Sequence, residues 1–242
     1  MMLSLIIPAY NEEKRLAKTL KEVNEYLMKQ DYGYEIIVVS DGSKDKTVEV
    51  VEGLFSEIKN LRLIDYKQNY GKGYAVRRGM LEAKGDYRIF TDADNSTSIR
   101  HLEKLLPELK AGFAVVIGTR DKRDHKEANQ AFPQPFYRRI LGDIFNYLVQ
   151  IVLGLWGLWD TQCGFKGFTK DAAEKIFPKC QINRWAFDPE ILVIARKMGY
   201  KIQIIPVYWI NDPASKVKFK GMVKMVAEVL RIKWNMITGK YQ

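Results

Sequence analysis

The stretch Tyr87-Arg-Ile-Phe-Thr-Asp-Ala-Asp94 decides the fold prediction, because an apolar run ends there in two carboxylates. The run Tyr87–Phe90 is typical of a buried strand, and Asp92 and Asp94 follow it two residues apart. Side chains alternate faces along an extended chain, so this spacing predicts that both carboxylates point the same way. Two co-facing acids at a strand end suit a hard divalent cation that carries substrate phosphates. Asp94 and Asp92 are therefore candidate ligands for Mg²⁺ or Mn²⁺, and the D-x-D spacing by itself is too common to be specific for metal.

Similar short runs, rich in Ile and Val and apolar on both faces, precede and follow this stretch. Such runs are typical of a buried, mostly parallel sheet. The predicted strands of the first half are 3–8, 35–40, 61–66, 86–92 and 114–118. Helical spacing predicts helices between them, the first after an Asn11 N-cap and the second from a Ser43 cap to about residue 58. Further helices are expected at 74–83 and 99–109, and the alternation predicts an α/β fold.

The pattern changes after residue 120, where the segment 120–127 is densely charged and predicts an exposed loop. Helices are then expected at 137–158, 172–177 and 189–197, and a strand at 201–209. The tail 218–238 predicts a basic amphipathic helix. We expect one domain over 1–218, with a nucleotide-binding half at 1–119 and an acceptor half at 120–218, followed by the helix at 219–242.

Bulk properties of the 242-residue chain narrow the class of protein. The net charge of +10 suits nucleic acid, an anionic membrane surface or a phosphate-rich substrate. Two cysteines form no C-x-x-C motif, and no secretion signal is recognised, so a cytoplasmic setting is expected. The apolar segment 144–159 is too short to span a bilayer, which leaves a buried helix or a helix at a membrane surface.

Ligands of open α/β sheets bind at the carboxyl ends of the strands, so the residues after each predicted strand are the candidate site. These ends carry acids, a tyrosine, glycines and cations, which suits a nucleotide diphosphate with metal. Taken singly, each also fits a helix cap or a turn. The segment Gly71-Lys72-Gly73 is neither a P-loop nor a dinucleotide-binding fingerprint, and the chain contains no G-x-S-x-G elbow.

The segments IIPAYNEEKRL, VVSDGSKDKT, NYGKGYAVRRGM and TDADNSTS resemble glycosyltransferase family 2, whose members have the GT-A fold. The resemblance implies inverting transfer of a sugar from a nucleotide-diphosphate sugar. The later segments DTQCGFKGF, RWAFDPEIL and PVYW…SKVK are similar to the polyprenyl- or dolichyl-phosphate sugar synthases, and RWAFDPEIL to their dolichyl-phosphate glucose branch. About seven ordered motifs between residues 3 and 218 carry the resemblance.

The resemblance also implies roles for residues of this chain. Asp41 would accept a hydrogen bond from the base, Lys72 would lie near the nucleotide, and Asp188 would lie near the acceptor. Asp94 would be the main metal ligand, with Asp92 on the ribose or sugar side. The nucleoside would be bordered by Pro8, Tyr10, Asn11 and Glu12. The sugar pocket would be lined by Gln162, Cys163 and Gly164. The candidates for gripping phosphate would be Arg120, Ser215 and Lys216. Apart from the resemblance, the positive charge of Arg138 or Arg139 could also offset the acceptor phosphate.

Two acceptors remain open. A lipid phosphate is largely dianionic near neutral pH and needs no strong base, whereas a sugar hydroxyl would need one, for which Asp188 is the candidate. Because proline suits the first positions of a helix, Asp188 before Pro189 is alternatively a plain N-cap. The expected partners are UDP-glucose, then UDP-N-acetylglucosamine or GDP-mannose, with a polyprenyl or dolichyl phosphate at the membrane and no nucleic acid.

Two rivals are a soluble transferase acting on a saccharide or protein and a basic nucleotide- or RNA-binding module. The tail helix fits either a membrane surface or packing on the domain.

Overall fold

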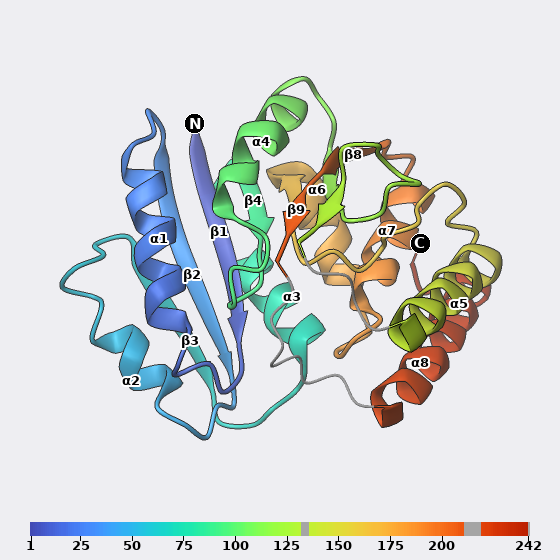
Figure 1. The fold of residues 1–242 in the computed structure, drawn as a ribbon, viewed down its shortest axis with the longest axis horizontal. Coiled ribbons are helices and arrows are strands. Elements are labelled where there is room, and N and C mark those ends of the chain that lie inside the picture. Colours follow the sequence, from blue (N-terminus) through green and yellow to red (C-terminus); the bar gives the residue numbers. More distant parts are fainter. Residues whose placement is uncertain (132–135, 211–218, 242) are drawn as a thin grey trace.

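A central sheet with helices on both faces forms the molecule (Figure 1). The computed structural model of the chain describes residues 1–131, 136–210 and 219–241, with the backbone alone for 136–141 and 219–223. In this part of the chain the main sheet has seven strands in the order β3-β2-β1-β4-β7-β5-β8. They are β1 (Met2–Ala9), β2 (Gly33–Asp41), β3 (Leu61–Tyr66), β4 (Tyr87–Phe90), β5 (Val115–Thr119), β7 (Lys166–Thr169) and β8 (Ile202–Pro206). The α/β prediction is therefore confirmed.

Every pairing in the sheet is parallel except those of β7, which runs antiparallel to both β4 and β5. The sequence prediction missed β7, a four-residue strand in a glycine-containing segment. The predicted strand at 201–209 divides into β8 and the short β9 (Tyr208–Trp209), which pairs with β6 (Asn129–Gln130). The carboxyl ends of β1, β2, β4 and β5 consequently open onto one edge of the sheet.

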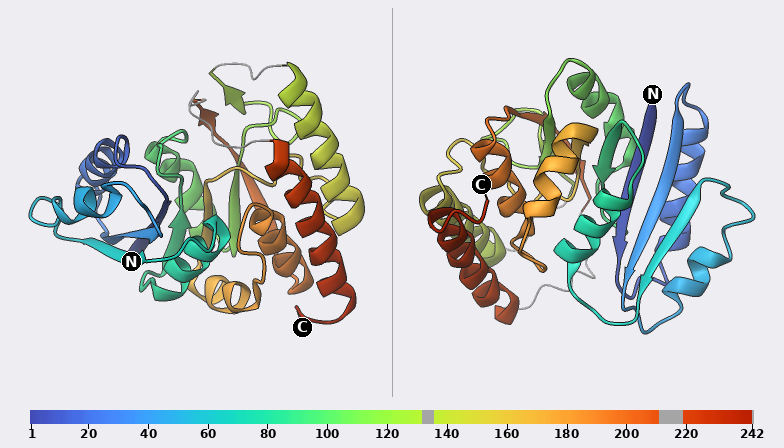
Figure 2. Two further views of the ribbon diagram at one scale, coloured as in Figure 1. Left: turned by 90° about the horizontal axis from the view of Figure 1, so that it is seen from below. Right: turned by 180° about the vertical axis from the view of Figure 1, so that it is seen from behind.

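The two faces of the sheet bury two separate hydrophobic clusters, because neighbouring side chains of a strand point to opposite faces. In β1, Leu3, Leu5 and Ile7 belong to one cluster and Ile6 to the other. The first cluster packs under α1 (Leu16–Met28), α2 (Thr47–Glu52) and α4 (Leu102–Lys110). The second packs under α3 (Lys72–Glu82), α6 (Lys170–Ile176) and α7 (Phe187–Lys197). Figure 2 shows the second set of helices from behind.

Two long helices complete the second cluster at one end of the molecule. They are α5 (Phe136–Leu153) and α8 (Phe219–Ile237), which lie side by side in both views of Figure 2. From α8, Met225, Val229 and Ile232 are buried in the same cluster as α7. The C-terminal helix therefore packs on the domain through these residues. No helix in the described part of the chain is long and apolar enough to cross a membrane.

Three predicted helix caps are wrong. The first helix begins at Leu16 with Arg15 at the N-cap position, and α2 begins at Thr47 after Lys46. Asn11 and Ser43 bond instead to each other's loops. Asp188 is the second residue of α7, whose N-cap is Ala186.

Candidate active site

The loops after β1 and β2 are joined into one unit by side chain–backbone hydrogen bonds. The backbone N–H of Asn11 donates to Ser43 Oγ at 3.1 Å, and Asn11 Oδ1 accepts from the backbone N–H of Lys44 at 2.8 Å. The Glu12 N–H donates to Thr47 Oγ1 at 2.8 Å. Asn11 adopts a φ of 55°, in the left-handed region that asparagine tolerates better than most residues. These bonds account for the failed cap predictions and fix the loop that carries Tyr10, which is 38% exposed.

Asp41, at the end of β2, holds the loop that follows β3. Its buried carboxylate accepts hydrogen bonds from the backbone N–H groups of Tyr70 and Gly71, at 2.8 and 2.7 Å, and from Asn69 Nδ2 at 2.8 Å. Gly71 has a φ of 114°, and a Cβ placed there would lie 2.4 Å from the carbonyl oxygen of Asn183. Only glycine fits at this contact. The loop that leads to Lys72 is thus clamped between Asp41 and the segment before α7.

Lys72, the first residue of α3, forms an ion pair with Asp92. Its Nζ lies 2.5 Å from Asp92 Oδ1 and 5.8 Å from the centre of the Phe187 ring. Burial by itself lowers the pKa of Lys72, but the charges of Asp92 and Asp188 outweigh it, so the pKa is raised. The lysine therefore stays charged at the edge of the sheet.

Asp94 lies beside this pair, although not for the reason that the sequence suggested. The strand β4 ends at Phe90, and the residues after it form a turn in which the Asn95 N–H donates to the Asp92 carbonyl. The prediction of two co-facing acids on an extended strand is therefore wrong in its geometry. The two carboxylates are nevertheless close enough to interact, since burial and the charge of Asp92 raise the pKa of Asp94.

Asp94 and Asp92 fit the ligand set of a hard divalent cation. Asp94 Oδ1 accepts from the Ser96 N–H at 3.0 Å, and Oδ2 lies 3.8 Å from Arg15 Nη1. The side chains of Asp94 and Asp92 keep 23% and 33% of their surface exposed, so incoming groups can reach them. Among the described residues no three potential ligands cluster for a metal. A cation here would therefore be completed by substrate oxygens, as Mg²⁺ usually is.

The segment Gln162-Cys163-Gly164 passes directly behind Asp92. A Cβ at Gly164 would lie 2.1 Å from Asp92 Oδ2, so any larger residue would displace the carboxylate. The Cys163 side chain is fully buried, and burial raises the pKa of its thiol to about 12. Cys163 therefore contributes shape rather than a thiolate nucleophile. Gln162 is partly exposed.

Asp188 is buried and paired with a lysine that the sequence did not single out. Lys166 Nζ, in β7, lies 2.5 Å from Asp188 Oδ1 and donates to the Cys163 carbonyl at 2.6 Å. Burial raises the pKa of Asp188 more than Lys166 and Lys72 lower it. A lysine inside the apolar segment CGFKGF was the available signal, because lysines are rarely buried without a partner.

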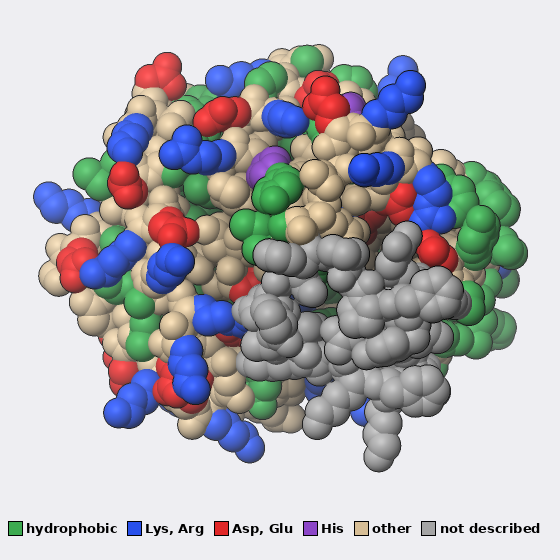
Figure 3. Space-filling model, in the orientation of Figure 1, with side chains coloured by type: hydrophobic (Ala, Val, Ile, Leu, Met, Phe, Trp, Pro, Cys, Tyr) green, Lys and Arg blue, Asp and Glu red, His purple; other side chains and the backbone are tan. Residues whose placement is uncertain are grey.

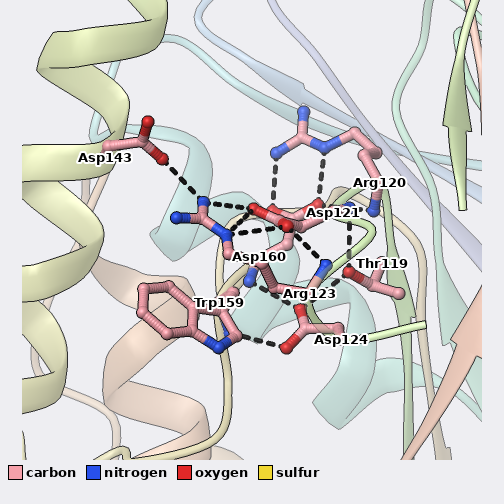
Figure 4. A network of polar contacts seen from close by, with 8 residues as sticks. All are labelled: Thr119, Arg120, Asp121, Arg123, Asp124, Asp143, Trp159 and Asp160. Carbon is pink, nitrogen blue, oxygen red and sulfur yellow. Dashed lines mark hydrogen bonds and ion pairs between the residues drawn. The ribbon is translucent and has the colours of Figure 1, made fainter. Parts of the chain in front are cut away.

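Arg120 lies in a polar network in which its guanidinium is already paired (Figure 4). Its Nε and Nη2 donate to the two carboxylate oxygens of Asp160 at 2.7 and 2.8 Å, and it stacks on the Trp209 ring at 5.2 Å. Burial lowers the pKa of Arg120, but Asp160 outweighs it and raises the pKa. Arg120 thus fixes the loop after β5 to the segment before β7.

The same network reaches α5. Arg123 forms ion pairs with Asp121 and with Asp143 on α5, and Asp124 accepts hydrogen bonds from the backbone N–H groups of Trp159 and Asp160 (Figure 4). The exposed loop predicted at 120–127 is therefore bonded at several points.

The remaining predicted site residues divide into two groups. Pro8 is buried in β1, one residue before the strand ends, and pairs in register with Val39. Ser215 and Lys216 lie outside the described residues, as do the side chains of Arg138 and Arg139. The described part of the site thus brings together Tyr10, Asn11, Glu12, Asp41, Lys72, Asp92, Asp94, Cys163, Gly164 and Asp188 around one edge of the sheet.

Comparisons with known proteins show the family and the fold of the chain. Residues 4–177 match the model of the family described as glycosyl transferase family 2. A dolichyl-phosphate beta-glucosyltransferase of Trichomonas vaginalis, ALG5D, is 41% identical over 239 residues, which cover 95% of this chain and 72% of the relative. The dolichyl-phosphate beta-glucosyltransferase of Homo sapiens is 36% identical over 254 residues, covering 99% of this chain and 77% of the relative.

Solved structures share the fold at much lower identity. The mannosyl-3-phosphoglycerate synthase of Rubrobacter xylanophilus has a TM-score of 0.71 at 16% identity, covering 99% of this chain and 75% of that one. The glucosyl-3-phosphoglycerate synthase of Mycobacterium tuberculosis has a TM-score of 0.69 at 15% identity, covering 99% of this chain and 79% of that one. That structure is a complex with Mn²⁺, UDP-glucose and phosphoglyceric acid.

Proposed function

The chain belongs to glycosyl transferase family 2, with a GT-A fold, and we propose that it transfers glucose from UDP-glucose to a polyprenyl or dolichyl phosphate, with inversion. The acidic edge carries the proposal, because Asp92 and Asp94 lie together there with Lys72 as their basic neighbour. Such a set suits a sugar diphosphate bound with a cation. The names of the relatives supply glucose and the lipid phosphate, and the complex of the structural neighbour supplies UDP-glucose and Mn²⁺.

The donor half of the proposal assigns roles along the edge. The nucleoside is bordered by Tyr10, Asn11, Glu12 and Pro8. Asp41 shapes the loop after β3 and faces the base. The sugar lies against Gln162, Cys163 and Gly164. Asp94, with Asp92, would hold Mg²⁺ or Mn²⁺, which when bound offsets charge on the leaving diphosphate. Lys72 adds a fixed positive charge on the same side, and the side chains are positioned before the donor arrives.

The acceptor half depends on charge rather than on a base. A phosphomonoester has its second pKa near 6 and is largely dianionic at neutral pH, so the nucleophile is already charged. Asp188, paired with Lys166, is then not required as a base. Since Arg120 is neutralised by Asp160, the acceptor phosphate would meet Ser215, Lys216 and the arginines 138 and 139.

A membrane surface is the proposed place of the reaction. Ile144, Tyr147 and Ile151 on α5 are 50–63% exposed, and so are Leu230 and Trp234 on α8 at 55% and 62%. Figure 3 shows hydrophobic side chains gathered at the end of the molecule where α5 lies. The exposed basic residues Lys224 and Arg231 on α8, and Lys240 just after the helix, accompany this stripe. Helices of this kind lie in the headgroup plane of anionic membranes. We call the exposed side chains Ile144, Tyr147, Ile151, Leu230, Trp234 and Ile237 the apolar ridge.

A donor screen tests the proposal. The protein is incubated with Mg²⁺ or Mn²⁺, a short polyprenyl phosphate and UDP-glucose, UDP-N-acetylglucosamine or GDP-mannose, and the lipid is analysed by mass spectrometry. We expect a hexosyl lipid phosphate from UDP-glucose, and none after chelation of the metal or in Asp94→Asn. A parallel reaction supplies a free saccharide in place of the lipid. Glycosylation of that saccharide without any lipid product in the first reaction would contradict the acceptor and favour the soluble transferase.

A further inference from the structure

Lys166 is fully buried beside the donor site and has no role in the proposal above. Its Nζ contacts Asp188 Oδ1 and the Cys163 carbonyl and lies 5.4 Å from the centre of the Phe90 ring. Taking two opposite charges out of water can cost as much free energy as their pairing returns, so the pair of Lys166 and Asp188 is not explained by stability alone. A methionine would fill a similar space without a charge, so the charge of Lys166 calls for a role of its own.

Lys166 belongs to a group of four charged side chains, which we call the charge row. Asp92 pairs with Lys72, Asp188 pairs with Lys166, and the Lys72 ammonium lies over the ring of Phe187, the residue next to Asp188. Lys72 is therefore within electrostatic reach of both acids, and both contribute to its pKa. With all four residues charged, the charge row is neutral and each acid has its own lysine.

We propose that Lys166 is a positioning residue for sugar transfer: by neutralising Asp188 it leaves Lys72 to Asp92 and to the diphosphate of the donor. Without Lys166, Asp188 would be a buried acid with Lys72 as the other cation that acts on it, and Lys72 would be drawn away from the edge. The inference rests on the proposed function for the class of donor.

The proposal predicts an asymmetry that a plain stabilising ion pair does not. Removing Lys166 leaves two acids competing for Lys72, whereas removing the charge of Asp188 removes the competitor. Loss of both charges restores the balance around Lys72. A pair that served only stability would affect unfolding in all three variants and donor binding in none that folds.

The test measures the dissociation constant for UDP in Mg²⁺ buffer by calorimetry, on Lys166→Met, Asp188→Asn and the double variant. We expect UDP to bind about ten-fold more weakly to Lys166→Met, and to bind the other two within about three-fold of wild type. The double variant is the decisive one. If it binds UDP nearly as wild type does, the effects of the two substitutions are not additive, which shows that Lys166 and Asp188 are energetically coupled. Unfolding in urea is measured in parallel.

Arg88→Met is the matched control. Arg88 is a buried cation of β4 near the opposite end of the strand, where it pairs with Glu174 at 2.7 Å. Its loss should lower stability and leave the dissociation constant for UDP unchanged.

Two results would overturn the proposal. One is a folded Lys166→Met protein that binds UDP as wild type does; the other is a double variant that binds UDP about ten-fold more weakly than wild type. If Lys166→Met does not fold, the affinities of Asp188→Asn and the double variant decide, and weak binding by both rejects the proposal. UDP binding needs no acceptor, so an error in the proposed acceptor would appear only in the lipid product.

Discussion

At the scale of single residues, Arg120 shows how a site prediction can depend on an unseen partner. The sequence made it a candidate for gripping phosphate, because a guanidinium fork suits phosphate oxygens. The same fork suits a carboxylate equally well, and Asp160 accepts from Nε and Nη2 of Arg120. Asp160 is forty residues further along the chain, and no local pattern links the two. Arg120 therefore orders the site through the loop that it holds.

Replacing Asp160 by asparagine should leave Arg120 without its charge partner. The two side chains are only 9% and 21% exposed, and breaking a buried pair typically costs about 3–5 kcal/mol of unfolding free energy. We expect a loss of this size for Asp160→Asn at pH 7, measured by urea unfolding. The matched control is Asp171→Asn, which breaks an exposed ion pair with Lys175 and should change stability little.

The loss should depend on pH in a defined direction. Burial raises the pKa of Asp160, but Arg120 outweighs it, so the folded-state pKa lies below the unfolded value of about 3.9. The ionised carboxylate therefore stabilises the fold above the unfolded pKa, and this stabilisation is lost as the pH falls through the folded pKa. The difference between wild type and Asp160→Asn should be constant from pH 7 to 5 and shrink below about pH 4. A difference that grows on acidification would contradict the assignment.

At the scale of elements, the strands of the first half were predictable and the caps were not. Apolar runs predict β1, β2, β3 and β5 to within two residues, because burial on both faces leaves a local signal. The strand β7 has four residues, including Gly167, and it exists through pairing with two strands distant in sequence. Asn11 and Ser43 have the composition of caps, but their hydrogen bonds go to each other's loops.

The residues of the candidate site were also only partly predictable: those that follow strands were found, and a pairing across the fold was not. The strand ends gave Asp41, Lys72, Asp92 and Asp94, since parallel strands bring their carboxyl ends to one edge. Lys166 was missed because its partner, Asp188, lies on α7, 22 residues further along the chain. Pairings across the fold are set by packing, which one sequence does not display.

The helix α8 contributes to the site as well as to the core. The segment 216–240 carries seven basic residues and a single acid, Glu228. Glu228 Oε2 accepts from the backbone N–H groups of Trp185 and Ala186, at 3.2 and 2.9 Å. These groups open α7, the helix that carries Asp188, and a negative charge near a helix N-terminus is stabilising. The acid of α8 thus fixes the start of α7.

Glu228→Ala should therefore loosen the start of α7. We expect about 1–2 kcal/mol lower stability in urea unfolding, because two backbone donors lose a charged acceptor. Amide hydrogen exchange at Trp185 and Ala186 should speed up in the variant. Glu25→Ala, which removes an acid paired with Lys29 on the surface of α1, is the control and should leave these amides unchanged. Unaltered exchange in Glu228→Ala would contradict the capping role.

At the scale of the whole molecule, the two faces of α8 reconcile the two interpretations left open by the sequence. Met225, Val229 and Ile232 pack into the core, while Leu230, Trp234 and Ile237 remain 55–69% exposed. The helix thus packs on the domain and still presents an apolar stripe. On α5, Asp143 connects the same end of the molecule to Arg123 and the site loop. The apolar ridge and the acidic edge are therefore parts of one packed unit.

The ridge predicts binding to anionic vesicles through a few exposed side chains. Deleting α8 would be a poor test, because Val229 and Ile232 are fully buried and their loss would disrupt the core. The triple variant Leu230→Gln, Trp234→Gln and Ile237→Gln changes only exposed positions of the helix. Each side chain gains roughly 1.5–3 kcal/mol when fully buried, so partial insertion of three makes a loss of about ten-fold or more in vesicle affinity the expected result.

Co-sedimentation with vesicles containing anionic lipid measures this loss. The matched control is Met28→Gln, Phe55→Gln and Leu81→Gln, which removes three exposed apolar side chains, 69%, 42% and 39% exposed, from other surfaces. If insertion through the ridge drives binding, only the ridge variant should remain in the supernatant, and higher salt should weaken wild-type binding through the flanking lysines and arginine. Equal sedimentation of both triple variants would show that general basic charge, rather than the ridge, brings the protein to the bilayer.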